Sequence, residues 1–261
     1  DSTLLDIGAA SGSNGQVKIV TWANGTEAEI ADMVSAARNG QIDLADYWAV
    51  GDARDASLSA IEASNDGIGS AQEACDICLV LMDQDSYVDA NDNPVNFVVG
   101  LKHSMPENCK MNTTDTNTGS WVDSGARTWC NNDFKDAFSE TLGSIFTQFK
   151  TVTADIYDGN TTQTCLDYFA FPAEKEVFGE CTYGNAAEAD ALSQFSYYSN
   201  TVNRVKLKDG GNVEHPNRGY AWWLRSPDGE SDTDFCSVNG RGAIDSGGAS
   251  NGNGVSPFGC I

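Results

Sequence analysis

The stretch that decides the fold is Gly219-Tyr220-Ala221-Trp222-Trp223-Leu224-Arg225-Ser226-Pro227, an aromatic segment typical of a β-strand closed by a proline turn. From Ser231 to Ile261 the chain has no Lys, Glu, Gln, Met or Trp and is rich in Gly, Ser, Asn and Asp. It nevertheless ends on Phe258, Cys260 and Ile261, which a free tail would not be expected to carry. We therefore interpret residues 219–261 as framework segments on either side of a variable surface, with the rest of the chain as support.

The overall composition is that of a folded protein. The chain has 261 residues, which is enough for one large domain or one medium domain with a small appendage. The hydrophobic fraction is 40% and the aromatic fraction is 10%, so a sizeable core can form.

The charge excludes some classes of partner. The formal net charge is −23 and the pI is about 4.1. Such a charge repels nucleic-acid phosphates and anionic membrane surfaces, so we expect neither as a partner. No apolar run approaches the length of about 18 residues that a membrane span needs, so we expect no membrane insertion.

Local patterns predict an α+β fold with long irregular loops. Thr26 and Glu29 have the spacing of a capping box, and apolar residues at helical spacing follow as far as Asn39-Gly40. The other expected elements are strands at 17–22, 58–61, 77–82 and 149–154, a helix from Asn131 or Asn132 through Phe146, and a short helix after Pro172. Residues 1–41 are expected to form an N-terminal arm with a small strand-helix element, and 42–261 the main domain.

Motifs for catalysis or metal binding are weak. The two histidines, His103 and His215, lie in polar segments where we expect them to be exposed, and no nucleophile or phosphate-binding motif is present. The even number of cysteines, eight, allows disulfides, but mostly free thiols are expected, and Cys75-x-x-Cys78 lacks a second pair for zinc. The Asp-rich segment 83–92 resembles a calcium loop but fails the EF-hand spacing. We therefore expect no catalytic residues, no metal and no cofactor.

Several segments together resemble a domain family of unknown function found in gut Firmicutes and their phages, with a C-type lectin-like fold. These segments are YAWWLRSP at 220–227, FCSVN at 235–239, GVSP at 254–257, and upstream 46–52, 126–132, 149–152, 174–179 and 203–206. One departure is the ending Pro257-Phe258-Gly259-Cys260-Ile261, where the family usually places the small residue before Phe.

The resemblance implies a function in recognition. Domains of this kind are similar to the variable proteins of diversity-generating retroelements, such as the phage major tropism determinant, whose C-terminal face binds ligands. The implied partner is a host or cell-surface protein or glycan, the implied location is a phage virion or tail, or a secreted or cell-surface position, and a homo-oligomer is an open possibility.

The missing residue types fit this mechanism. Retroelements mutate template adenines, and an Asn codon changed at its first two positions cannot yield Lys, Glu, Gln, Met or Trp. Those five types make up about a fifth of average usage, so chance would remove them from such a run in about one case in a thousand. Ordinary Gly/Ser/Asn-rich loops also deplete them, so this alternative stays open.

Strand alternation predicts which residues bind. Cys236, Val238 and Ile244 share one parity and are expected to point inward, and at most one of Trp222 and Trp223 is expected in the core. Phe235 and Arg241 are the expected anchors. The predicted ligand-binding residues lie on the other parity and on the flanking loops: Asp228, Ser231, Asp232, Thr233, Asp234, Phe235, Ser237, Asn239, Arg241, Ala243, Asp245, Ser250, Asn251 and Asn253.

Two alternatives remain from the sequence. One is a structural decoration domain without a specific ligand. The other is an enzyme, because formylglycine-generating enzymes share a C-type lectin-like fold and use paired cysteines. Cys236 and Cys260 are the candidates, on the sole ground that they lie near the end of the chain.

Overall fold

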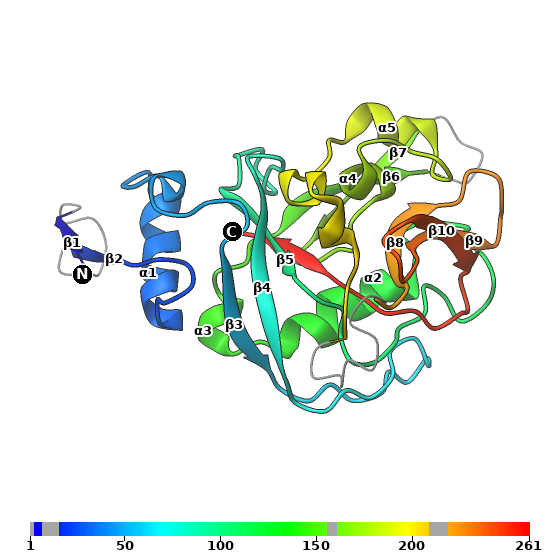
Figure 1. Cartoon of the computed structure of the whole chain (residues 1–261), viewed down its shortest axis with the longest axis horizontal. Helices are drawn as coiled ribbons and strands as arrows, with labels where there is room; N and C mark the ends of the chain where they lie inside the picture. Colours follow the sequence, from blue (N-terminus) through cyan, green and yellow to red (C-terminus); the bar gives the residue numbers. More distant parts are fainter. Residues whose placement is uncertain (1–2, 7–15, 156–160, 209–218) are drawn as a thin grey trace.

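The computed structural model describes residues 3–6, 16–155, 161–208 and 219–261. It has a mixed α/β fold in which sheets predominate and helices are few and short (Figure 1). The expected α+β class is thus confirmed at this level. His215 lies outside the described residues.

A four-stranded antiparallel sheet forms the centre of the molecule. Its order is β11-β5-β4-β3, which places the last strand of the chain next to a strand from its first half. The strands are β3 Ala53–Leu58, β4 Cys75–Gln84, β5 Phe97–Leu101 and β11 Phe258–Cys260. β4 contains the predicted strand 77–82, whereas the strand expected at 58–61 ends at Leu58 because β3 pairs with β4 only that far.

The C-terminus is locked into this sheet. Ile261 N–H donates to Phe97 O (3.0 Å), and Ile261 O accepts from Asn96 N–H (2.8 Å). The Phe258 ring is fully buried with Tyr87, Phe149 and Phe195 around it. A Cβ on Gly259 would lie 2.7 Å from the Phe146 ring and 2.8 Å from Tyr168 O, so the core requires this order of large and small residues.

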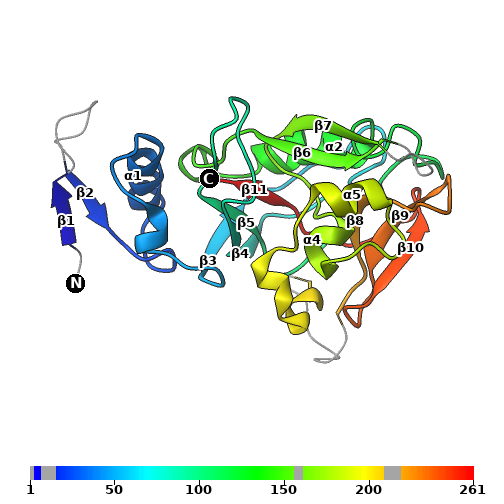
Figure 2. The same ribbon diagram turned by 90° about the horizontal axis from the view of Figure 1, so that it is seen from above.

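The N-terminal elements pack beside the central sheet (Figure 2). They are β1 Thr3–Asp6 and β2 Gln16–Ile19, then α1 Glu27–Arg38 and the 3-10 turn η1 Leu44–Asp46. The predicted capping box of Thr26 and Glu29 is confirmed. Trp22 Nε1 donates to Leu79 O (3.5 Å) and its ring packs edge-on against Trp48, so this part shares the core of the rest. The predicted boundary at 41/42 stays a prediction, and residues 1–2 and 7–15 of the arm lie outside the described residues.

The helix predicted from Asn131 or Asn132 through Phe146 is wrong in its limits. Ser124 caps the helix seven residues earlier through Arg127 N–H (3.1 Å), and Ser139 starts a separate turn. The segments are α2 Gly125–Trp129, the π-helical η2 Cys130–Phe134 and α3 Glu140–Gly143. The apolar spacing in the sequence continues across the break at Ser139, because Phe134, Phe138 and Phe146 on either side of it pack into one aromatic cluster. The spacing therefore does not reveal where the first helix ends.

Two smaller sheets and several short helices cover the other side of the core. β6 Phe149–Ala154 pairs with β7 Thr162–Asp167, and the limits of β6 are those predicted. The short helices and turns are α4 Glu174–Phe178, α5 Ala186–Ala191, η3 Ser196–Ser199 and η4 Thr201–Arg204. The third sheet has the order β10-β9-β8, with β8 Trp222–Pro227, β9 Asp234–Val238 and β10 Ile244–Gly248. It lies at the end of the molecule opposite α1 (Figures 1 and 2).

A buried ion pair joins these layers. The guanidinium of Arg225 on β8 makes a bidentate contact with Glu176 of α4 (2.6 and 2.8 Å), and both side chains are almost completely buried. It also donates to Phe171 O, to Val152 O on β6 and to the hydroxyl of Tyr87. Every guanidinium N–H therefore has an acceptor, which offsets the cost of burying the charge.

Replacing Arg225 should be strongly destabilising. We expect Arg225→Met to lower the free energy of unfolding by about 3–5 kcal/mol, because Glu176 would remain buried without its partner. Urea unfolding followed by tryptophan fluorescence measures the loss. The double variant R225M/E176Q removes both charges and should recover part of the stability; equal losses in the two variants would contradict a dominant role of the ion pair.

Candidate functional site

The strand β8 is a framework element that is covered on both faces. All six of its residues are buried, including both Trp222 and Trp223 at 0% exposure. The expectation that at most one tryptophan is core is therefore wrong. Trp222 stacks near Tyr198 and lies under Lys206 Nζ (5.1 Å to the ring centre), whereas Trp223 Nε1 donates to Cys109 O (2.9 Å) in a loop on the other face.

The neighbouring strand β9 is covered in the same way. Cys236 and Val238 are buried as predicted, but Phe235 and Ser237, predicted to face outward, are buried too (0% and 3% exposed). Strand pairing places Ser237 opposite Trp223, and the loop 105–117 covers that face. Alternation alone could not reveal this, because the covering loop is more than a hundred residues away in sequence.

The remaining predicted residues lie at the rim of the sheet. Ile244, predicted inward, is half-buried because β10 is an edge strand. We call the exposed set Asp232, Arg241, Ala243, Asp245 and Asn251 the C-terminal surface. The half-buried predicted residues are Ser231, Thr233, Asp234, Asn239, Ser250 and Asn253, and the buried ones are Asp228, Phe235 and Ser237.

Main-chain hydrogen bonds hold the segment that carries this surface. Cys109 and Asn253 exchange a pair of bonds (N···O 2.9 and 3.1 Å). Met111 and Asn112 N–H groups both donate to Ala249 O (3.0 and 2.9 Å). Because these donors and acceptors belong to the backbone, the attachment does not depend on which side chains the segment carries.

A single buried side chain fixes the loop 228–234. The amide nitrogen of Asn117 lies 2.7 Å from Ser231 O, 2.9 Å from Asp234 O and 3.5 Å from Asp228 O. Its backbone N–H also donates to Asp232 O (3.0 Å). Asn117 thus holds the loop through carbonyl groups alone. Sequence reasoning missed it, because nothing in the irregular segment 83–118 indicates that this residue contacts β9.

Some predicted binding residues instead form turns. Asn239 Oδ1 accepts from the N–H groups of Arg241 and Ala243 (2.9 and 3.2 Å), while Gly242 adopts a left-handed φ of 78°. Asp228 Oδ1 accepts from Glu230 N–H (2.9 Å). These two side chains shape the loops, whereas the guanidinium of Arg241 has no hydrogen bond or ion pair within the described part of the chain.

The C-terminal surface is acidic and includes a shallow pocket. Its members Asp232 and Asp245 are exposed acids, two further exposed acids, Asp115 and Glu230, lie on neighbouring loops, and hydrogen bonds from Ser250 lower the pKa of Asp115. Arg241 and Asn239 line a pocket of about 460 Å³ together with Tyr220, which is 51% exposed. Neither Asp115 nor Tyr220 was predicted to bind, the latter because its segment resembles a fixed framework. The geometry suits a ligand that offers hydrogen-bond donors or positive charge.

The cysteines do not have the properties of reactive groups. Cys236 and Cys260 are fully buried free thiols, and burial raises the pKa of each well above its ordinary value. Such thiols stay protonated and inaccessible at neutral pH. Cys109 and Cys130 are also buried free thiols, as expected for this chain.

The two candidate metal-binding segments, Cys75-x-x-Cys78 and 83–92, do not bring their side chains together as a set of metal ligands. Cys75 and Cys78 lie three residues apart on β4, so they point to opposite faces of the sheet. Asp89 in the calcium-like segment accepts from Asn91 and Asn93 N–H, and Asp92 pairs with Lys150. Within the described residues no group of three or more His, Cys, Asp or Glu is placed to hold a metal ion. His103 is half-buried, not exposed as expected, because it follows the buried strand β5.

Comparisons with known proteins identify one family. The family described as Domain of unknown function (DUF6273) matches residues 80–261. No curated protein matches the chain, and no solved structure matches it either. In the described ranges, no helix has the length and apolarity needed to cross a membrane.

Replacing Asn117 tests how the loop is held. We expect Asn117→Ala to lower the free energy of unfolding by about 1–3 kcal/mol, because Ser231 O and Asp234 O lose their donor. Urea unfolding measures this, and amide hydrogen exchange at 231–234 should become faster. The matched control is Asn251→Ala at an exposed position, where a change within about 0.5 kcal/mol is expected. Equal effects of the two substitutions would contradict this role of Asn117.

Proposed function

We propose that this chain, which belongs to the DUF6273 family of unknown function, is a ligand-recognition protein with a C-type lectin-like fold whose C-terminal surface contacts the ligand. The resemblance to variable proteins of retroelements suggests a phage virion or tail protein that binds a protein or glycan on a host cell. The insertion of β11 into the central sheet supports a framework in which the C-terminal strand is fixed and the preceding loops are free to differ.

One observation carries this proposal. The exposed side chains of the C-terminal surface sit on a backbone that is held by main-chain bonds and by Asn117, which lies outside the variable segment. Substitutions at 232, 241, 243, 245 and 251 can therefore change the surface while the fold stays intact. A surface of this kind matches a recognition role better than a catalytic one, for which a fixed constellation of side chains is needed.

The charges narrow the class of ligand. Aspartates and Glu230 around the surface disfavour anionic ligands, whereas Arg241 and Tyr220 offer one charged and one aromatic contact. We expect a polar partner that is neutral or positively charged where it meets this surface. The buried state of Cys236 and Cys260 gives no support to the enzyme alternative.

Binding to cells tests the surface directly. Fluorescent protein would be incubated with a panel of gut bacteria and with a glycan array. The triple variant R241A/D245A/N251A should lose at least about tenfold in binding, since a few anchors dominate such contacts, with its melting temperature unchanged. The matched control is K135A/D136A/N132A, which changes half-buried Lys135 and exposed Asp136 and Asn132, none of them part of the C-terminal surface. Retained binding in the first variant would show that this surface is not the site.

Sibling sequences test the variability. In related chains from the same source, we expect substitutions at Asp232, Arg241, Ala243, Asp245 and Asn251. Phe235 and Asn117 should not change, because one is buried opposite Pro227 and the other holds the loop. Sequencing the 3′ end of the gene across isolates measures this, together with a search for a nearby reverse transcriptase. Identical C-terminal segments in all isolates would favour a structural decoration domain instead.

A further inference from the structure

A second pocket lies away from the C-terminal surface, against the central sheet. It has a volume of about 390 Å³ and opens between the start of β3, the middle of β4 and the turns η3 and η4. None of its lining residues belongs to 219–253. A ligand bound here would therefore contact the fixed part of the chain.

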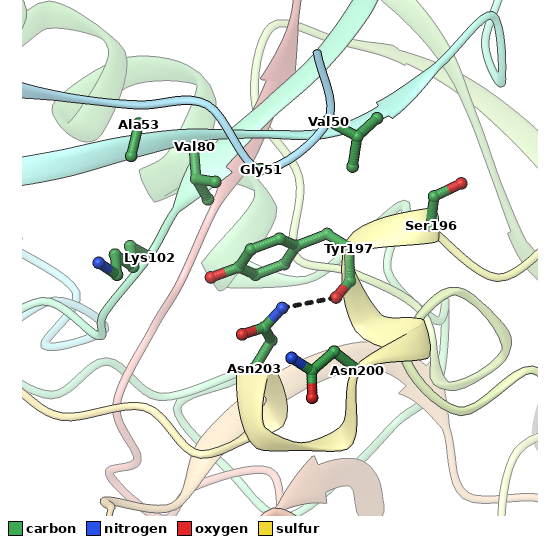
Figure 3. A pocket seen from close by; sticks show the side chains of 9 residues that line it. All are labelled: Val50, Gly51, Ala53, Val80, Lys102, Ser196, Tyr197, Asn200 and Asn203. Atoms are coloured by element: carbon green, nitrogen blue, oxygen red, sulfur yellow. Dashed lines mark hydrogen bonds between the residues drawn. The ribbon is translucent and has the colours of Figure 1, made fainter. Parts of the chain in front are cut away.

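An aromatic ring forms the wall of this pocket. Figure 3 shows Tyr197 lying across it, with Val50 and Val80 on one side and its hydroxyl directed toward Lys102. The ring is held in place from behind, since it packs edge-on against buried Tyr198 (5.4 Å between ring centres). Asn203 Nδ2 also donates to Tyr197 O (2.7 Å). The wall is thus preorganised before any ligand arrives.

Four polar atoms around the ring are available to a ligand. Tyr197 Oη, Lys102 Nζ, Asn200 Nδ2 and Asn203 Oδ1 make no hydrogen bond to any residue that the structure describes. Burial raises the pKa of Tyr197 to about 12, so its hydroxyl remains a neutral donor. Ser196, by contrast, donates to the carboxylate of Asp83 (2.7 Å) and shapes the rim.

The apolar and polar groups of the pocket together define a class of ligand. The Tyr197 ring and the valines suit a ligand with a flat apolar face, and the asparagine amides and the Tyr197 hydroxyl suit a ligand with several hydroxyl groups. Lys102 supplies one positive charge in the pocket. The net charge of −23 on the whole protein repels a polyanionic ligand such as a nucleotide more strongly than a ligand with one negative charge. At physiological salt this long-range repulsion of a small monoanion is largely screened.

We propose that this pocket binds a sugar acid, a monosaccharide with one carboxylate, by packing its ring face on Tyr197 and pairing its carboxylate with Lys102. The side-chain amides of Asn200 and Asn203 form hydrogen bonds with its hydroxyl groups. The site is independent of the proposed variable surface and provides an unvarying contact to acidic surface sugars.

Saturation-transfer NMR with methyl glucuronide, and with methyl glucoside as its neutral counterpart, tests this. We expect the acid to bind with a Kd of about 1 mM, a typical value for a ligand of this size, and the neutral sugar about three- to tenfold more weakly. Lys102→Gln should remove the preference for the acid, and Tyr197→Ala should weaken both sugars by about tenfold or more.

Controls separate this site from the C-terminal surface. Lys110→Gln, at a lysine that does not line the pocket, and R241A/D245A/N251A should leave sugar binding unchanged. Absence of saturation transfer from both sugars at concentrations of about 10 mM would overturn the proposal. Equal binding of the two sugars, or a preference for the acid that persists in Lys102→Gln, would overturn the assignment to sugar acids.

Discussion

The buried pair of Arg225 and Glu176 is the constraint on which the rest of the structure depends. One guanidinium binds a carboxylate from α4, a carbonyl from β6 and the hydroxyl of Tyr87 near β5. A charged group can stay in such an interior only when all of its donors are satisfied, so these elements must keep their mutual positions. The strand β8, which carries Arg225, is therefore a fixed base for the third sheet.

The same base explains how the proposed variable surface and a stable core can share one short sheet. β8 and most of β9 are buried on both faces, so their residues cannot vary without loss of packing. Variation is possible in the edge strand β10, in the loops at its ends and in the loop 228–234 between β8 and β9. After β10 the backbone is held by main-chain hydrogen bonds to the loop 105–117. Because these bonds involve no side chains, they form whichever residue stands on the exposed side.

The two candidate sites differ in charge and in origin. The C-terminal surface carries two aspartates of its own and lies on an edge strand and its loops, which suits adaptable hydrogen bonding. The pocket around Tyr197 is built on the strands β3 and β4 and two short turns, and it carries one lysine. A protein with both could combine an unvarying weak contact with a variable specific one, and two linked contacts bind more tightly than either alone.

The sequence by itself determined the local features: the capping box at Thr26, the strand β6, the buried strand within β4 and a C-terminus that belongs to the core. These follow from neighbouring residues, whose spacing and capping groups act over a few positions. Only the tertiary structure decided that both Trp222 and Trp223 are buried, that Phe235 and Ser237 are buried as well, and that Asn117 holds the loop 228–234. The physical reason is distance along the chain: burial of a strand face depends on segments about a hundred residues away, and alternation within the strand cannot reveal them.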